Sequence, residues 1–162
     1  PNIEPYDEYV KRKEEQIRFL KEFHTVYPIA FLDSDYDADA FLKMSKGLES
    51  EKEGGIRCHK CYRLRLEKTA QVAKEKGFDY FGTSLTVSPY KNAEKINEIG
   101  EELAGKYALS FLYSDFKKED GYKKSILMSK EYHLYRQDYC GCRFSKEARE
   151  KEKRLKALEK SL

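Results

Sequence analysis

Apolar side chains recur every three to four residues over much of this chain, which is the spacing of an amphipathic helix. Pro5 suits a first helical position, and Gly47 and Gly77 suit positions just past the end of a helix. The pattern predicts helices at residues 5–24, 37–46, 60–76, 92–106 and 121–132. A further, highly charged helix is expected within residues 143–162, with Ser145 as its N-cap.

Three short apolar runs bounded by turn residues predict buried strands. They are Tyr27–Leu32, Phe78–Val87 and Ala108–Tyr113, and Ser88-Pro89 breaks the second of them. Strands that alternate with helices are typical of a mostly parallel sheet. We therefore expect one α/β domain over residues 1–162, with a three-layer, Rossmann-like arrangement. Three strands are few for such a sheet, so we also expect that an N-terminal strand is missing from this chain.

Composition narrows the class of protein. Of the 162 residues 38% are charged, yet the formal net charge is only +3. A protein whose whole surface binds nucleic acid would have a higher net positive charge, so any contact of this chain with RNA would use local basic patches. No apolar run approaches the roughly 18 residues of a transmembrane helix, and no N-terminal signal is visible. Four cysteines in two tight pairs do not match the disulfide framework of a secreted domain, so we expect a cytoplasmic protein without membrane contact.

Cys58 and Cys61 form a CxxC motif on the loop that leads into the helix expected from Lys60. The helix N-terminus and the cationic neighbours favour the thiolate, which is the form of cysteine that binds metals and acts as a nucleophile. A lone CxxC fits half of a zinc site, part of an iron–sulfur site, a dithiol redox pair or two inert cysteines. No second CxxC follows at zinc-ribbon spacing, and a Gly-Gly loop rather than a strand precedes the motif.

Cys140 and Cys142 flank Gly141, which permits unusual backbone angles between the two thiols. A disulfide here would close a small, strained ring, and strained disulfides are easily reduced and tend to be catalytic or regulatory. Arg136 and Arg143 lie nearby in the sequence and would favour the thiolate. Alternatively both thiols bind metal, or both are small buried residues at a helix start. Together the four cysteines would suffice for one iron–sulfur cluster or for a zinc ion.

Polar residues gather where the second predicted strand ends and a helix starts, which is where open α/β sheets bind ligands. Ser88, Tyr90, Lys91 and Asn92 supply hydroxyls, an ammonium group and helix-start amides, which suit an anion. The alternative is an ordinary turn in which Asn92 is the N-cap of the helix. We take these four residues, together with Arg136, as candidates for substrate binding.

Basic residues follow both cysteine pairs, and tyrosines at 132, 135 and 139 precede the second pair. Lysine and arginine neutralise backbone phosphates, and aromatic rings stack on unpaired bases, so these stretches suit RNA. The alternative, above all for the terminal helix, is a solvated face on which glutamates interleave with the cations.

Four blocks of the sequence carry a family resemblance. They are PNIEPYDEY at the start, RCHKCYRLRLEKTA at 57–70, FGTSLTVSPYKN at 81–92 and LYRQDYCGCRFS at 134–145. With these blocks in this order, nearly the whole chain resembles the QueH-type epoxyqueuosine reductases. The resemblance implies an α/β fold related to the PP-loop (HUP) nucleotide-binding proteins. It also implies the last step of queuosine synthesis, in which the epoxide of epoxyqueuosine in the tRNA anticodon loop is reduced to an alkene.

The same resemblance implies a cofactor, partners and roles for the cysteines. The family carries a 4Fe–4S cluster, for which Cys58 and Cys61 are expected ligands. Cys140 and Cys142 resemble a redox-active pair or the ligands of an additional iron. The implied partners are tRNA with epoxyqueuosine at the wobble position and an external electron donor. Family members also have an N-terminal strand followed by a Cys-Cys pair with further cluster ligands, and we expect this segment to be absent here.

The reaction consumes two electrons and releases the epoxide oxygen as water. A nearby acid would protonate that oxygen, and Tyr135, Tyr139 and Lys91 are candidates for it. Two other functions use the same thiols: a zinc-binding, non-catalytic RNA-binding module, and a metal-free dithiol oxidoreductase.

Overall fold

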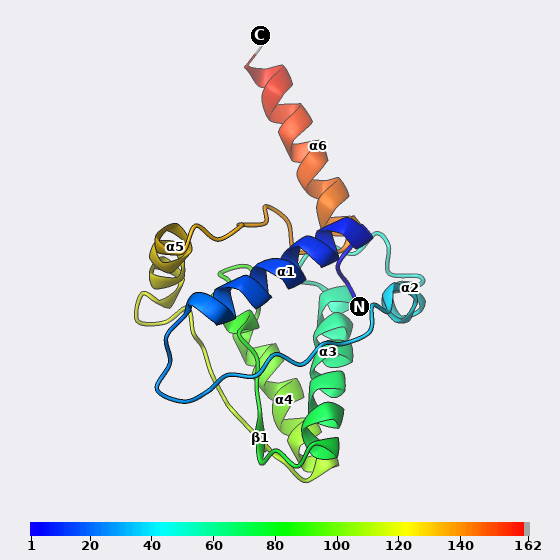
Figure 1. The fold of residues 1–162 in the computed structure, drawn as a ribbon. Helices are drawn as coiled ribbons and strands as arrows, with labels where there is room; N and C mark the ends of the chain where they lie inside the picture. The colour runs from blue at the N-terminus through cyan, green and yellow to red at the C-terminus, as the bar shows by residue number, and fades with distance from the viewer. Residues whose placement is uncertain (161–162) are drawn as a thin grey trace. The chain divides into compact units, whose positions relative to one another are not determined.

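A computed structural model describes residues 1–160 of the chain (Figure 1). The chain divides into two compact units, one made of residues 1–39 and 128 onward, the other of residues 40–127. Six α-helices lie within the described residues, and each corresponds to a helix expected from the sequence. They are α1 (Tyr6–Glu22), α2 (Ala38–Ser45), α3 (Ile56–Glu75), α4 (Ala93–Tyr107), α5 (Gly121–Glu131) and α6 (Arg143–Glu159).

The start of α3 differs from the prediction. The helix begins at Ile56 rather than near Lys60, so the CxxC motif lies inside the helix and not on the loop before it. Gly55 is the N-cap, and the Glu51 carboxylate accepts a hydrogen bond from the Ile56 amide at 3.3 Å. This carboxylate satisfies one of the amides that a helix start leaves without a partner, and its negative charge suits the positive end of the helix dipole.

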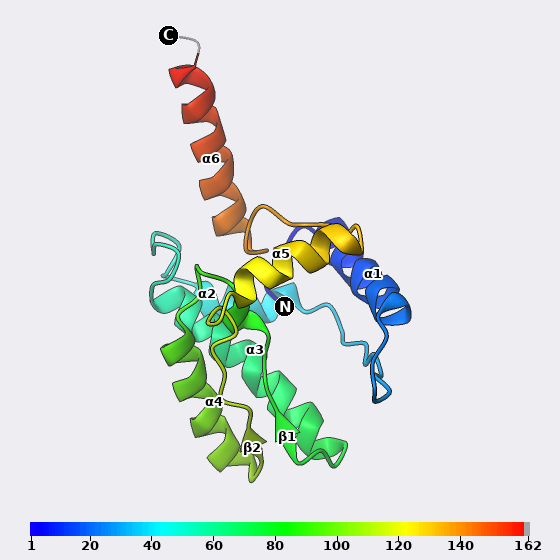
Figure 2. The same cartoon turned by 90° about the vertical axis from the view of Figure 1, so that its left-hand side faces the viewer.

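Strands β1 (Tyr80–Phe81) and β2 (Ser110–Phe111) form a two-stranded parallel sheet, in which Tyr80 pairs with Ser110 (Figure 2). The expected strand 78–87 is therefore much shorter than predicted, because a 3-10 turn at Leu85–Val87 interrupts the extended backbone. The mostly helical chain with a parallel β1–α4–β2 unit is compatible with the α/β class. Among the described residues, the two-stranded sheet is smaller than the sheet expected for a three-layer, Rossmann-like fold, so that arrangement is not shown.

The predicted strand Tyr27–Leu32 is wrong, because the structure has no strand in this segment. Its side chains are exposed: 80% for Tyr27, 53% for Ile29 and 48% for Leu32. An apolar run becomes a strand only when a neighbouring strand binds its backbone groups, and this segment pairs with neither β1 nor β2.

The core of the second unit lies where α3 and α4 pack side by side and against the two strands (Figures 1 and 2). Its ten buried members are Tyr62, Leu66, Ala70, Ala73, Phe81, Ile96, Ile99, Leu103, Ala104 and Phe111. Asn97 of α4 extends this core to the loop after β2, because its side-chain amide donates to the Ser114 carbonyl at 2.9 Å and accepts from the Ser114 amide at 3.2 Å. The Thr86 and Ser114 hydroxyls are 3.3 Å apart, so buried polar contacts hold together the loops that follow both strands.

The first unit is held by side-chain contacts rather than by a buried helix face, since α1 has no buried residue. The rings of Phe19, Phe23 and Tyr132 pack together, with centroids 5.1 to 5.8 Å apart. The Arg18 guanidinium donates to the Tyr132 carbonyl at 3.0 Å. These contacts fasten α1 to the segment that leads to the second cysteine pair. Within residues 1–160, no helix is both long and apolar enough to cross a membrane.

The close contact between α4 and β2 predicts a sharp difference between two glycines of α4. A Cβ atom added to Gly100 would overlap the ring of Phe111, whereas one added to Gly105 would meet no atom. We expect Gly100→Ala to lower the free energy of unfolding by about 2 kcal/mol through overpacking. Gly105→Ala should raise it by about 0.5–1 kcal/mol, because alanine is the better helix former. Urea denaturation of both variants checks this, and equal effects would contradict the packing.

Candidate functional site

Cys58 and Cys61 lie in the first two turns of α3, three positions apart and therefore on the same side of the helix. Cys61 is buried and Cys58 half-buried, and neither forms a disulfide. Cys58 lies in the first turn of α3, where the helix dipole acts, whereas Cys61 lies one turn further along the helix. The predicted pairing of these two thiols at a helix start is therefore found, one turn deeper in the helix than expected.

The loop before α3 is built around the sulfur of Cys58. The amide of Gly54 donates a hydrogen bond to the Cys58 Sγ at 3.3 Å, and Gly54 itself has a φ of +88° that favours glycine. At Gly55 an added Cβ would lie 2.6 Å from the Glu51 carboxylate, so a larger residue here would displace the side chain that caps α3. An amide that donates to sulfur stabilises the negative thiolate over the neutral thiol.

Arg57 fixes the other end of this loop. Its guanidinium is buried at 5% exposure and donates to the carbonyls of Leu48 and Glu49 at 2.7 and 2.9 Å. Buried charge needs such partners, so the loop is held against the first turn of the helix. Arg57, a cation next to Cys58 in the sequence, thus has a structural role in this loop.

Lys91, one of the candidate substrate-binding residues, contacts the same loop. Its side chain is 7% exposed, and its Nζ lies 3.0 Å from the Glu53 carboxylate, next to Gly54. Ser88 and Asn92 take part in local turns: the Ser88 hydroxyl accepts from the Tyr90 amide at 3.3 Å, and the Asn92 side chain caps α4 by accepting from the Lys95 amide at 2.9 Å.

The capping interpretation of Asn92 is therefore confirmed, while the binding role of these residues stays a prediction. Tyr90 is 76% exposed, so its ring is available for stacking against a ligand. Of the candidate proton donors, Lys91 is already bound to a carboxylate in this structure.

The second cysteine pair lies on a tight turn of the first unit. Gly141 has a φ of +134°, and an added Cβ would lie within 3.1–3.4 Å of side-chain atoms of Arg12, Ile3 and Asn2. Its carbonyl accepts from the Glu4 amide at 2.7 Å. Only glycine combines this backbone angle with so close an approach of the chain's first residues.

Arg12 holds this turn from α1. Its guanidinium donates to the carbonyls of Cys140 and Tyr139 at 3.1 and 3.3 Å, and its Nε lies 2.8 Å from the Glu8 carboxylate. The Tyr139 hydroxyl donates to the Glu4 carbonyl at 2.6 Å, and the Tyr135 hydroxyl donates to Glu8 at 3.1 Å. Both tyrosines considered as proton donors are therefore engaged in holding the turn.

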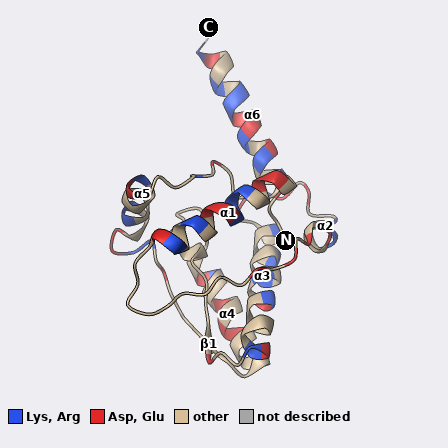
Figure 3. Ribbon diagram, in the orientation of Figure 1, with Lys and Arg blue, Asp and Glu red and all other residues tan. Residues whose placement is uncertain are grey.

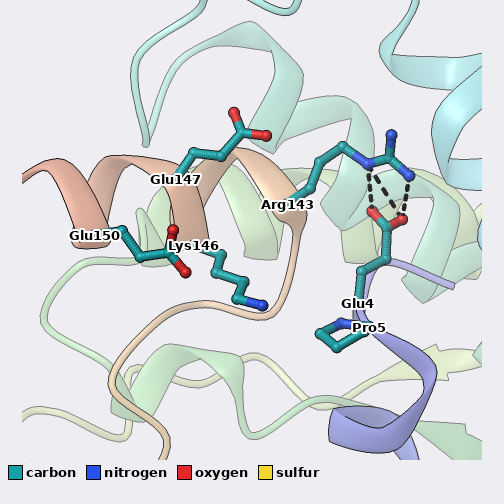
Figure 4. A pocket seen from close by; sticks show the side chains of 6 residues that line it. All are labelled: Glu4, Pro5, Arg143, Lys146, Glu147 and Glu150. Atoms are coloured by element: carbon teal, nitrogen blue, oxygen red, sulfur yellow. Dashed lines mark hydrogen bonds and ion pairs between the residues drawn. The ribbon is translucent and has the colours of Figure 1, made fainter.

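The two arginines expected to act on these thiols bind other groups. Arg143 forms an ion pair with the Glu4 carboxylate at 2.5 Å, and Arg136 donates to the Ser129 hydroxyl at 2.7 Å. Figure 4 shows the Arg143–Glu4 pair at the rim of an open pocket of about 350 Å³. Its remaining lining residues are Pro5, Lys146, Glu147 and Glu150. This pocket mixes both charges and contains none of the cysteines.

The residues that hold both thiol pairs could not be recognised from the sequence pattern; they are Arg12, Glu8, Glu4 and Glu53. Their contacts join segments far apart in the chain, 127 residues apart for Tyr135 and Glu8. The one available signal was the opening block PNIEPYDEY, which carries Glu4 and Glu8.

The donor set at the start of α3 fits an iron–sulfur site in part. Two cysteines on one helical face, one of them receiving an amide hydrogen bond, are suitable cluster ligands. Within neither unit do three or more His, Cys, Asp or Glu side chains of the described residues form a group that could hold a metal ion. A four-thiolate cluster would need sulfur ligands in addition to Cys58 and Cys61.

Residues 1–148 match the family model described as epoxyqueuosine reductase QueH. The chain belongs to the QueH family. A QueH protein of Streptococcus pyogenes serotype M1 is 47% identical over 87% of this chain and 56% of its own length. A QueH protein of Staphylococcus epidermidis is 44% identical over 90% of this chain and 63% of the relative. A QueH protein of Thermotoga maritima is 36% identical over 90% of this chain and 75% of the relative.

The matches to the first two QueH relatives therefore cover between half and two thirds of those proteins. Both cysteine pairs, the SPYKN block and the N-terminal residues that hold Gly141 lie inside the family match. Most of α6 lies beyond its end at residue 148.

The Lys91–Glu53 pair predicts a stability difference between two chemically identical substitutions. Glu53→Gln removes the carboxylate charge beside a buried ammonium group, so we expect the free energy of unfolding to fall by about 1–2 kcal/mol. Glu98→Gln removes the partner of Lys95, which is 34% exposed, and should cost at most about 0.5 kcal/mol. Urea denaturation of both variants measures the difference, and a larger loss for Glu98→Gln would contradict the assignment.

Tyr139 predicts a pH dependence. Burial, together with the negative charge of Glu8, raises the pKa of Tyr139 to about 12. The unfolded value is about 10, so the contribution of the neutral phenol to stability is full below pH 10 and is lost as the pH rises towards 12. The absorbance at 295 nm of the native protein minus that of Tyr139→Phe should titrate near pH 12. A midpoint near 10 would show that this phenol is not buried.

Proposed function

We propose that this chain belongs to an iron–sulfur oxidoreductase that reduces epoxyqueuosine to queuosine in the anticodon loop of tRNA, acting in the cytoplasm with an external electron donor. The observation that carries the proposal is the Cys58 sulfur at the start of α3, which receives the Gly54 amide and shares a helical face with Cys61. Two thiols held in this way suit metal binding, and the chain belongs to the QueH family, which together support the proposal.

In this proposal Cys58 and Cys61 are two ligands of a 4Fe–4S cluster, which when bound would supply electrons one at a time. The Gly54 amide donates to the Cys58 sulfur, and a donor in this position stabilises an anionic ligand. Lys91 keeps the Gly54 loop in place through Glu53. The resemblance that assigns the ligands also leads us to propose that β1 and β2 belong to a larger parallel sheet of the PP-loop type.

The overall reaction takes up two electrons and two protons, breaks both carbon–oxygen bonds of the epoxide, and releases water and an alkene. Oxidation of the Cys140 and Cys142 thiols to a disulfide would supply two electrons and two protons, which balances this reaction. The strained ring that such a disulfide closes would be readily reduced again by the external donor. Binding of an additional iron by the same two thiols is the alternative role.

For the substrate, Tyr90 provides the exposed ring that suits stacking on an unpaired base. Ser88 and Asn92 lie in the turn around it, and the exposed Arg136 is a candidate for a phosphate contact. Lys91 would act on substrate binding indirectly, because it holds the loop of Glu53 and Gly54 in place.

The test is cluster formation and turnover in the polypeptide at the full length of its QueH relatives. After anaerobic purification, Cys58→Ser and Cys61→Ser should each lose most of the bound iron and acid-labile sulfide, because a ligand is removed. Cys142→Ser should keep the sulfide and lose reductase activity on tRNA that carries epoxyqueuosine. Iron, sulfide and queuosine product are the three quantities measured.

Three outcomes would contradict the proposal. Stoichiometric zinc without sulfide or turnover would indicate the zinc-binding RNA module instead. Full activity in Cys58→Ser without metal would indicate a dithiol enzyme. Normal turnover in Cys142→Ser would remove the second cysteine pair from the reaction.

A further inference from the structure

Helix α6 carries the net charge of the whole chain. It has seven lysines and arginines against four glutamates, a surplus of three that equals the formal net charge of the protein. Along the ribbon the two signs interleave (Figure 3). Around the helix axis they separate, because residues spaced alternately by three and four positions fall on one side.

Five cations have this spacing. They are Lys146, Arg149, Lys153, Lys156 and Lys160, which we call the basic stripe. At 3.6 residues per turn they occupy roughly a quarter of the helix circumference, and none of the four glutamates of α6 falls within that arc. With a rise of 1.5 Å per residue the stripe is about 21 Å long.

The carboxylates near the stripe neutralise it only in part. Glu152 pairs with Arg149 at 2.7 Å and with Lys156 at 2.5 Å, and Asp138 pairs with Lys153. All of these side chains are between 39% and 63% exposed, and ion pairs so exposed contribute little to stability. Two carboxylates for five cations leave the stripe positive, and a phosphate can replace them at small cost.

We propose that the basic stripe of α6 binds the phosphate backbone of the RNA substrate. The inference rests on the proposed function for the identity of the RNA, while the surface itself follows from the spacing of the cations. A row of five cations, against which only Glu152 and Asp138 place a carboxylate, complements a strand of regularly spaced phosphates. The stripe adds affinity without reading bases, because lysine contacts to phosphate carry no sequence information.

The test compares two double variants of the same helix in the chain as it stands. Lys153→Gln with Lys156→Gln removes two charges from the stripe. The control, Lys151→Gln with Arg154→Gln, removes two charges from outside it. The dissociation constant for unmodified bulk tRNA is measured by fluorescence anisotropy between 50 and 300 mM KCl, and circular dichroism confirms equal helix content.

For the stripe variant we expect roughly five- to tenfold weaker binding at 100 mM KCl and a salt slope smaller by about 1.5 to 2, because two phosphate contacts are lost. The control should stay within about twofold. Equal losses of affinity in both variants would show that only net charge matters. No loss of affinity in the stripe variant would show that the stripe is a solvated face. Each of these results, or the absence of tRNA binding by the unaltered chain, would overturn the inference. Cluster content and turnover judge the proposed function separately, since they depend on the cysteines and not on α6.

Discussion

The hydrogen bond from the Gly54 amide to the Cys58 sulfur ties the loop before α3 to the first turn of that helix, and both cysteine ligands proposed for this unit depend on it. It combines a glycine with a positive φ and a helix that starts within one turn of the sulfur and is capped by the Glu51 carboxylate. The buried charges of Arg57 and Lys91 then fix the loop from two sides. Such buried polar groups specify one loop geometry, because any other would leave them without partners.

The second thiol pair is positioned by the close approach of two backbone segments, those of Glu4 and Gly141. Here the chain crosses itself at Gly141, and Arg12 donates to two successive carbonyls of the turn. Gly141 adopts its positive φ without strain, and the first twelve residues hold the turn in place. The two pairs are thus supported independently, one by a helix start and the other by a crossing of distant segments.

The helices could be predicted from the sequence because an apolar stripe with a polar N-cap or a glycine stop is a local signal, as Asn92 at the start of α4 and Gly77 after α3 show. The first turn of α3 was missed, because its cap is a carboxylate five residues upstream rather than a side chain at the N-cap position. The strand predicted at Tyr27–Leu32 is wrong, because an apolar run of this kind becomes a strand only when a partner strand binds its backbone. The cysteine pairs could be recognised as candidate site residues from their spacing in the sequence. The roles of Arg12 and Glu53 could not be predicted, because they arise from contacts between residues far apart in the chain.

The crossing at Gly141 also bears on biosynthesis. The carbonyl of Gly141 accepts a hydrogen bond from the amide of Glu4, so the turn with Cys140 and Cys142 closes only after both residues, 137 positions apart, have left the ribosome. Contacts between such distant segments form late, since a long loop must first close. The contacts of the helix that carries Cys58 and Cys61 span shorter stretches of chain, since the Lys91–Glu53 pair joins residues only 38 positions apart. A nascent chain would therefore fold the surroundings of Cys58 and Cys61 before those of Cys140 and Cys142.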